Sequence, residues 1–543
     1  MLRRLRRTEC DLLIRAGTIY DGRGGAPVAG DVAIHGDRIA AVGPLHGWRA
    51  REEIDARDLA VSPGFVNMLS WANESLLEDG LAQSDLRQGV TLEVLGEGTS
   101  MGPLNEAMKE EFAAQSLFGL RAEWTTLGEF LDYLVEHGVA PNVASFVGAD
   151  TVRVHELAAE DRPPTNDELN RMQALVRRAM REGAVGVSSA LVYAPAFYAD
   201  TAELIALARA AAEYDGMYIS HLRSEGNRLL EALEEFLIIA RDAEIRAEIY
   251  HLKAAGEANW AKLERVVDRV EQARREGLTV TADMYTYTAG ATGLNGAMPP
   301  WVQEGGFEAW RSRLSNPDVR ARVEQEMTTD TDEWENMFLL AGPDNMRLLA
   351  FRSDRLRPLT GLTLLEVAEQ RGTSPAETAM DLVVEDGSRV STAYFTISEE
   401  NLRRELRLPW VSLCSDSAAP TAGGVFRQWS THPRAYGSFA RLLGKYVREE
   451  QVLSLEEAIQ RLTALPASNL RLADRGLVEQ GYYADLVVFD PDRIEDHATF
   501  DEPHRYATGV SDVVVNGTLA LRDGEPTGAL PGRVVRGPGW DLR

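Results

Sequence analysis

The chain is poor in cysteine. Cys10 and Cys414 are its two cysteines among 543 residues. Two cysteines cannot build a disulfide framework or a cysteine-rich zinc site. Free thiols are typical of reducing compartments, so the sequence predicts a cytoplasmic protein.

Long apolar runs and positive charge are also scarce. No run of about 18 uncharged apolar residues occurs, so we expect no membrane-spanning segment. The basic residues 1–8 lack the apolar stretch of a signal peptide. With 57 Lys and Arg against 84 Asp and Glu, the net charge is -27, which argues against general electrostatic binding to nucleic acid or anionic membrane. No sequence feature marks the oligomeric state, and a homo-oligomer stays open.

The chain is long and apolar enough for more than one domain. Its 543 residues, 44% of them hydrophobic, suit a large barrel with an accessory domain. Residues 1–62 and 471–543 contain short strand-like runs separated by Gly, Asn and Asp, and Asn516-Gly517 predicts a hairpin turn. We therefore expect the two ends of the chain to pair in one small β-sandwich.

Residues 63–470 alternate predicted strands and helices. Strand-like runs lie near 90–95, 184–189, 218–221, 247–251 and 279–284. Helical patterns separate them and predict helices over 166–182, 200–214, 226–243 and 258–276. This rhythm predicts an α/β fold, a parallel TIM (β/α)8 barrel. Residues 294–350 interrupt the rhythm, and we interpret them as an inserted subdomain that covers the mouth of the barrel.

Two histidines end consecutive predicted strands. His221 lies in Ser-His-Leu-Arg-Ser-Glu-Gly, and His251 lies in Tyr-His-Leu-Lys-Ala-Ala-Gly. Strand ends of a parallel barrel converge on one cavity, and neutral imidazole is a good zinc ligand. We expect both histidines to bind a metal. The alternative is a pair of core histidines or hydrogen-bond partners of a substrate.

Two carboxylates are candidates to complete this site. Glu97 follows the strand near 90–95, and its flanking glycines let the backbone turn and bring the carboxylate inward. We predict that Glu97 is the third metal ligand, with Glu93 as its rival and an exposed loop acid as the alternative. Asp416 is predicted to act as general base and acid, taking a proton from the attacking water and returning it to the leaving amine. Its alternative role is a helix N-cap.

Other polar residues near the strand ends are candidates for substrate binding. Arg223 and Lys253 each lie two positions after a predicted ligand histidine, and either can bind a carboxylate. Tyr285 and Tyr287 can donate to a developing oxyanion, and Arg434 can bind a carboxylate. A surface or salt-bridge role is the alternative for each. The predicted partner is a small-molecule substrate that carries a carboxylate.

Motifs along nearly the whole chain carry a resemblance to a known family. They are Pro63-Gly-Phe-Val-Asn-Met-Leu-Ser-Trp71, Gly183-Ala-Val-Gly-Val-Ser-Ser-Ala-Leu-Val-Tyr193, His221-Leu-Arg-Ser-Glu-Gly226, His251-Leu-Lys-Ala-Ala-Gly256, Tyr285-Thr-Tyr-Thr-Ala-Gly290, Ser415-Asp416, His432-Pro-Arg434 and Gly481-Tyr-Tyr-Ala-Asp-Leu-Val-Val-Phe-Asp490. Together they resemble the D-aminoacylase (N-acyl-D-amino-acid deacylase) group of the amidohydrolase superfamily. The resemblance implies a TIM barrel with a small β-sandwich and zinc-dependent amide hydrolysis.

The resemblance also implies roles for individual residues. In this family the counterparts of His221 and His251 bind zinc, and the counterpart of Asp416 is the catalytic acid and base. The counterparts of Lys253, Tyr285 and Arg434 bind the substrate. The family's cysteine ligand aligns with Gly98, so Glu97 must substitute from one residue earlier.

The chain departs from the family at its first barrel strand. The family reads P-G-F-I-D-x-H-x-H, and its two histidines hold a metal. Leu69 and Trp71 occupy those positions here. We therefore expect about one zinc ion per chain, with Trp71 as a wall of the substrate pocket.

Three functions follow as hypotheses. The first is a zinc-dependent hydrolase of a C–N amide bond in an N-acyl-D-amino acid or a related peptide-like substrate. The second is a related hydrolase that acts on a lactone or a cyclic amide or ureide. The third is a non-catalytic pseudoenzyme with a binding role.

Overall fold

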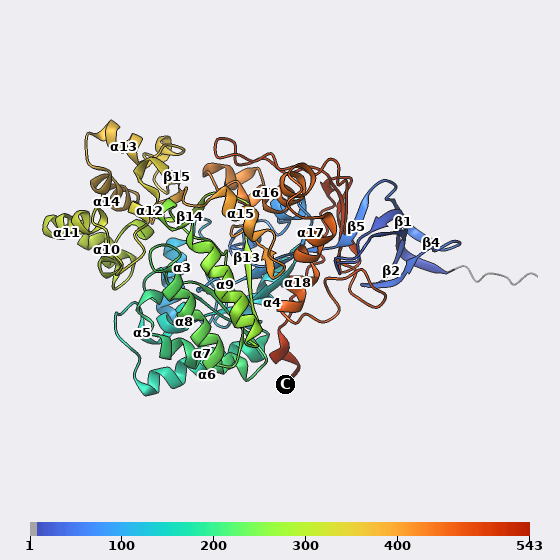
Figure 1. Ribbon diagram of the computed structural model, residues 1–543, viewed down its shortest axis with the longest axis horizontal. Helices are drawn as coiled ribbons and strands as arrows, with labels where there is room; N and C mark the ends of the chain where they lie inside the picture. The colour runs from blue at the N-terminus through green and yellow to red at the C-terminus, as the bar shows by residue number, and fades with distance from the viewer. Residues whose placement is uncertain (1–7, 543) are drawn as a thin grey trace, which may run out of the picture.

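The computed structural model describes residues 8–542, so residues 1–7, part of the stretch predicted to lack a signal peptide, lie outside it. Three bodies follow one another along the long axis (Figure 1). Strands from the N-terminus form one end, a ring of strands and helices forms the middle, and an inserted segment forms the other end. Within the described residues, no helix is both long and apolar enough to cross a bilayer.

The middle body is a closed parallel barrel. Its strands are β6 Phe65–Asn67, β7 Val90–Leu95, β8 Asn142–Ser145, β9 Val147–Gly148, β10 Gly186–Ala190, β11 Met217–His221, β12 Arg246–Ile249, β13 Val280–Met284 and β17 Val411–Leu413. Phe146 alone separates β8 from β9, so these two occupy one position in the ring, between β7 and β10. The ring closes between β6 and β17, where the Met68 N–H donates to Leu413 O at 3.3 Å.

Helices cover the outside of this ring. They are α1 Ser75–Glu78, α2 Gln83–Leu86, α3 Glu106–Gln115, α4 Leu127–His137, α5 Ala149–Leu157, α6 Asn166–Glu182, α7 Thr201–Ala212, α8 Leu229–Asp242, α9 Lys262–Arg275, α15 Glu399–Glu405, α16 Arg434–Arg441, α17 Leu455–Leu462 and α18 Ala464–Asn469. This alternation of strand and helix is the TIM (β/α)8 architecture that the sequence predicts.

Local signals determine where the helices begin and end. In α6, the Thr165 side chain accepts the Glu168 N–H while the Glu168 carboxylate accepts the Thr165 N–H. The helix ends at Gly183, whose φ of 108° suits a residue without a Cβ atom. Between Met172 and Met180, four buried residues at helical spacing face the barrel core. Full burial of a valine or methionine side chain, such as Val176 or Met180, stabilises the fold by about 1.5–3 kcal/mol.

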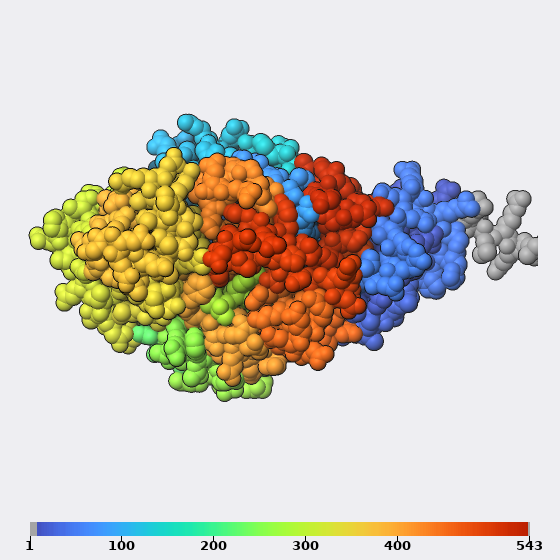
Figure 2. All heavy atoms as spheres, turned by 90° about the horizontal axis from the view of Figure 1, so that it is seen from above, coloured from blue at the N-terminus to red at the C-terminus, as the bar shows by residue number. Residues whose placement is uncertain are grey.

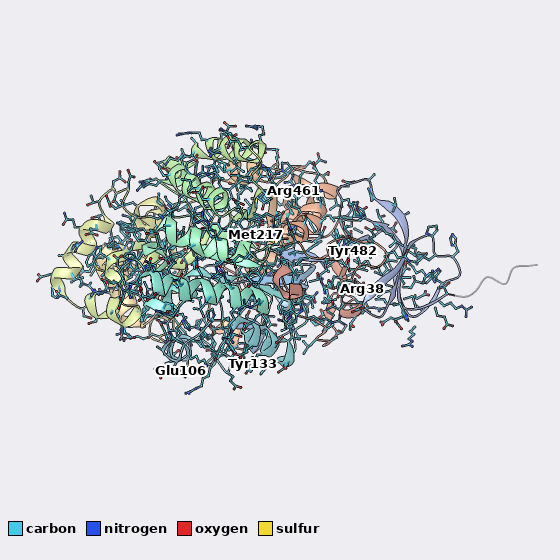
Figure 3. All side chains as sticks on the ribbon, turned by 90° about the horizontal axis from the view of Figure 1, so that it is seen from below. Arg38, Glu106, Tyr133, Met217, Arg461 and Tyr482 are labelled. Carbon is cyan, nitrogen blue, oxygen red and sulfur yellow. The ribbon has the colours of Figure 1, made fainter. Side chains whose placement is uncertain are left out.

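The two ends of the chain share one nine-stranded sheet. Its strands are β1 Glu9–Ile19, β2 Val28–His35, β3 Arg38–Gly43, β4 Arg49–Asp55, β5 Ala60–Pro63, β18 Leu486–Phe489, β19 Val510–Val515, β20 Thr518–Arg522 and β21 Glu525–Pro526. The strands β5 and β18 pair antiparallel and so join the N-terminal and C-terminal parts. Arg38 and Tyr482 lie close together in this region (Figure 3), and the Ile39 N–H donates to Tyr482 O.

The insertion has its own core and is longer than the sequence predicts. Its elements are β14 Gly290–Gly293, α10 Phe307–Arg313, α11 Pro317–Met327, α12 Met337–Ala341, β15 Met346–Ala350, α13 Leu364–Arg371, α14 Pro375–Asp386 and β16 Ser391–Tyr394. A separate apolar cluster runs from Leu294 to Tyr394, and β16 pairs with both β14 and β15. The predicted end near residue 350 is therefore too early. The helices α13 and α14 continue the strand–helix rhythm of the barrel, so their local pattern does not separate them from it. The insertion is the yellow end of the molecule in Figure 2.

Candidate metal and catalytic site

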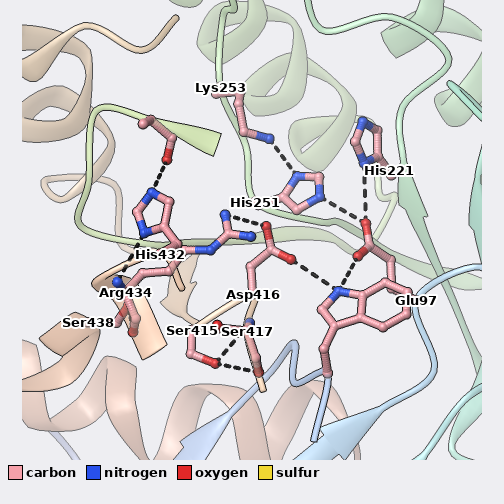
Figure 4. A network of polar contacts seen from close by, with 12 residues as sticks. Glu97, His221, His251, Lys253, Ser415, Asp416, Ser417, His432, Arg434 and Ser438 are labelled. Carbon is pink, nitrogen blue, oxygen red and sulfur yellow. Dashed lines mark hydrogen bonds and ion pairs between the residues drawn. The ribbon is translucent and has the colours of Figure 1, made fainter. Parts of the chain in front are cut away.

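The three predicted metal ligands converge at the carboxyl ends of the barrel strands. Glu97 follows β7, His221 ends β11, and His251 follows β12. Glu97 Oε1 lies 2.9 Å from His251 Nε2 and 3.2 Å from His221 Nδ1 (Figure 4). All three side chains are buried, and one ligand atom from each lies within 4.8 Å of the others. Two imidazole nitrogens and one carboxylate oxygen form a donor set that suits zinc and leaves a coordination position for water or substrate.

The backbone around Glu97 explains why the carboxylate comes from this position. Gly98 has a φ of +62°, and a Cβ atom there would lie 2.5 Å from Asp150 Oδ2 and 2.6 Å from Ala190 Cβ. A cysteine at this position would collide with both neighbours. Glu97 reaches the site from one residue earlier, as the sequence predicts.

Electrostatics holds these ligands together. Burial raises the pKa of the Glu97 carboxyl, but the imidazoles of His251 and His221 outweigh burial and hold this pKa below its usual range. Burial and the Lys253 ammonium lower the pKa of His251, but the carboxylates of Glu225 and Glu97 outweigh them and raise it to about 10. The negative charge of the Glu97 and Glu225 carboxylates therefore surrounds the imidazoles and stabilises positive charge there, as a cation site requires.

Glu225 is a site residue that sequence reasoning missed. Its Oε1 lies 2.7 Å from Lys253 Nζ and 3.1 Å from His251 Nδ1, and its Oε2 lies 3.5 Å from His221 Nε2. It therefore contacts both imidazoles on the nitrogens that face away from Glu97. Carboxylates in this position orient histidine ligands and select their tautomer. The available signal was a carboxylate four residues after His221 in the same motif.

Asp416 lies beside the predicted ligands. Its Oδ2 lies 2.7 Å from Arg434 NH1, and its Oδ1 accepts the Trp71 Nε1–H at 3.2 Å. Burial raises the pKa of Asp416, and the Arg434 guanidinium opposes this rise. Asp416 and His251 have φ values of 48° and 33°, in the left-handed region that costs a non-glycine residue about 1–3 kcal/mol. Such strain is common at catalytic sites, where the surrounding structure holds it in place.

Comparison with known proteins agrees with this arrangement. The Amidohydrolase family matches residues 124–520. The D-aminoacylase of Alcaligenes xylosoxydans xylosoxydans is 31% identical over 526 residues, which cover 97% of each chain. The chain belongs to the amidohydrolase family.

Solved structures share the fold along the whole length of this amidohydrolase. An N-acyl-D-glutamate deacylase from Bordetella bronchiseptica, complexed with zinc and a phosphonate mimic of the tetrahedral intermediate, is 29% identical with a TM-score of 0.80. A D-aminoacylase described in terms of one-metal activation and second-metal attenuation is 32% identical, also with a TM-score of 0.80. Both comparisons cover 97% of this chain and 100% of the other. The chain is thus a metal-dependent amidohydrolase.

Three of the residues predicted to bind substrate gather at the amidohydrolase site. Tyr285 is buried, with the Arg434 guanidinium 4.5 Å and Lys253 Nζ 5.7 Å from the centre of its ring. His432, which the sequence reasoning did not assign, accepts the Arg434 backbone N–H and contacts Ala289 O at 2.9 Å. It therefore fixes the start of the helix that carries Arg434. The available signal was its place two residues before Arg434.

Other candidates have different partners. The Arg223 guanidinium pairs with Glu235 at 2.7 Å and donates to Phe197 O and Ala199 O, so we withdraw Arg223 from the substrate-binding residues. Tyr287 is directed to Asp496 at 3.4 Å.

Glu93, the rival metal ligand, accepts the Asn67 amide at 2.9 Å. Burial raises the pKa of Glu93 to about 6. Because Glu93 lies in mid-strand with this partner, it does not join the group formed by Glu97, His221 and His251.

Proposed function

We propose that this amidohydrolase hydrolyses the amide bond of an N-acyl-D-amino acid, with one zinc ion held by Glu97, His221 and His251. The observation that carries the proposal is the position of Glu97 Oε1, within 3.2 Å of a nitrogen on each imidazole. The names of the D-aminoacylase and N-acyl-D-glutamate deacylase relatives support the substrate class. The two buried free cysteines support a reducing, cytoplasmic setting.

Glu97, His221 and His251 would hold the zinc, which would supply Lewis acidity to polarise the amide carbonyl and to acidify the attacking water. The ionised Asp416 then takes one proton from that water as the new C–O bond forms. When the C–N bond breaks, Asp416 gives this proton to the leaving nitrogen, and the products are a carboxylate and a free D-amino acid. Arg434 favours the ionised form of Asp416, the form that a general base needs.

The substrate carboxylate is proposed to bind between the two cations that flank Tyr285. The Lys253 ammonium and the Arg434 guanidinium both lie over the Tyr285 ring, and both side chains are buried. The Tyr285 hydroxyl provides a neutral hydrogen-bond donor beside them, since burial raises its pKa well above the usual value. Trp71, a residue that is 38% exposed, is proposed to form a wall at the mouth of this pocket.

The test is metal analysis together with a substrate panel. We expect about one zinc per chain in the purified protein and loss of that zinc in the His221→Ala/His251→Ala double variant. N-acetyl-D-amino acids should be hydrolysed in preference to their L-enantiomers, to lactones and to cyclic ureides. Metal without D-amino-acid deacylation would reject the substrate class, and absence of bound or activating zinc would reject the zinc site.

A further inference from the structure

Trp71 joins the predicted zinc ligand to the predicted base. Its single indole N–H lies 3.0 Å from Glu97 Oε2 and 3.2 Å from Asp416 Oδ1 (Figure 4). Each carboxylate uses its other oxygen elsewhere, because Glu97 Oε1 faces the imidazoles and Asp416 Oδ2 faces Arg434. The indole therefore contacts the two oxygens that the remaining groups of the site leave available.

We infer that the Trp71 N–H is a positioning group that occupies the place of a second metal ion. Two buried carboxylates that approach one another repel unless a donor or a cation lies between them. The indole nitrogen donates a hydrogen bond and has no lone pair for a metal. It can thus hold Glu97 and Asp416 in place and cannot coordinate an ion there. This inference rests on the proposed zinc site.

The backbone fixes the indole in this position. The backbone N–H of Trp71 donates to Ser417 O at 2.9 Å, and the backbone N–H of Ser70 donates to Val94 O at 2.9 Å. The segment is thereby hydrogen-bonded to β7 on one side and to the chain after β17 on the other. These two hydrogen bonds place the Trp71 side chain next to both carboxylates, because Glu97 follows β7 and Asp416 directly precedes Ser417.

The neighbouring side chain excludes a second ion as well. Leu69 is fully buried, and its carbonyl oxygen accepts the Asp416 N–H at 2.9 Å. A leucine provides no ligand atom at a position that adjoins Asp416. Across residues 8–542, the sole group of three or more acidic, histidine or cysteine side chains with ligand atoms this close together is Glu97, His221 and His251. These residues therefore allow the binding of one metal ion per chain. We also expect that excess zinc does not reduce turnover, because no second ion can bind beside Asp416.

The first arm of the test measures metal capacity by titration with Co²⁺, followed by absorption spectroscopy and elemental analysis. The wild-type chain should saturate at one equivalent. The Leu69→His/Trp71→His variant should gain a second equivalent, because two imidazoles then lie beside Asp416. Two equivalents in the wild type, or one in the folded double variant, would overturn the inference. No bound metal in the wild type would instead reject the proposed function.

The second arm tests positioning with Trp71→Phe, which keeps an aromatic ring and removes the N–H. We expect one metal equivalent and a fall in kcat of roughly tenfold or more, with KM changed less than about twofold. The matched control is Trp410→Phe, since the Trp410 N–H donates to Glu271 at 2.7 Å outside the site. Unchanged kcat in Trp71→Phe, or an effect confined to KM, would reduce Trp71 to a pocket wall and overturn the inference. This arm decides the question even if the double variant fails to fold.

Discussion

One imidazole is held between two carboxylates: Glu225 Oε1 lies 3.1 Å from His251 Nδ1, and Glu97 Oε1 lies 2.9 Å from Nε2 of the same ring. Glu225 and Lys253, whose Nζ lies 2.7 Å from the same Nδ1, occupy this side of the ring and leave Nε2 facing the metal position. We expect Glu225→Gln to weaken zinc affinity by about 10–100-fold, because it removes a carboxylate charge beside the ring and the ion-pair partner of Lys253. Competition with a chelator measures this affinity. Glu235→Gln, at a carboxylate that pairs with Arg223, is the matched control. Equal zinc affinity in the two variants would contradict the assignment.

Glu97 is predicted to bind zinc, and its mid-strand rival Glu93 is not. Glu97→Ala removes the oxygen that faces both imidazoles, so zinc affinity should fall by at least roughly tenfold. Glu93→Gln should retain wild-type affinity, because Glu93 hydrogen-bonds Asn67 within the barrel. Metal content after dialysis against a range of free zinc concentrations compares the two. If Glu93→Gln lost the metal and Glu97→Ala kept it, the third ligand would be reassigned.

The pH dependence of kcat/KM should report on Asp416. Burial raises the pKa of this carboxyl, and only its ionised form accepts a proton. Activity should therefore fall as pH drops through this raised pKa, and the acidic limb should lie above the usual carboxyl range of about 4. The Arg434 guanidinium, 2.7 Å from Asp416, favours the ionised form of this carboxyl. Arg434→Gln removes that guanidinium, so the acidic limb should move to higher pH.

The companion variant for this profile is Asp416→Asn. It should retain zinc and lose about 10²–10⁴-fold in kcat, because an amide cannot take the proton. An acidic limb that stays in place in Arg434→Gln would show that another group controls it.

Arg223 and Lys253 occupy equivalent positions after the two histidines but should respond differently to substitution. Arg223 pairs with Glu235 and two backbone carbonyls, so Arg223→Met should lower stability by about 1–3 kcal/mol and leave KM unchanged. Lys253→Met should raise KM roughly tenfold or more, because it removes a cation beside Tyr285. Thermal unfolding and steady-state kinetics separate the two effects. A raised KM in a stable Arg223→Met protein would restore Arg223 to the substrate-binding residues.

Regular local patterns made much of the fold predictable. The helix predicted over 166–182 spans Asn166–Glu182, and those predicted over 226–243 and 258–276 differ from α8 and α9 by a few terminal residues. Asn516-Gly517 forms the turn between β19 and β20, with φ values of 47° and 78°. Capping residues, turn residues and hydrophobic periodicity act over a few positions, so they can be interpreted without the rest of the chain.

The sequence by itself determined the barrel, the pairing of the two chain ends in one β-domain, and the positions of His221, His251 and Asp416 at strand ends. The tertiary structure alone decided what those residues contact. Trp71 is 26 residues from Glu97 and 345 from Asp416 along the chain, yet one N–H serves both. Arg223 and Lys253 have equal spacing from their histidines. Only the packing of neighbouring helices and loops places Arg223 against Glu235 and Lys253 against Glu225 in the site. The end of a strand is marked by residues close together in the sequence. The hydrogen-bond partner of a side chain at that end depends on which distant segment of the chain packs next to it.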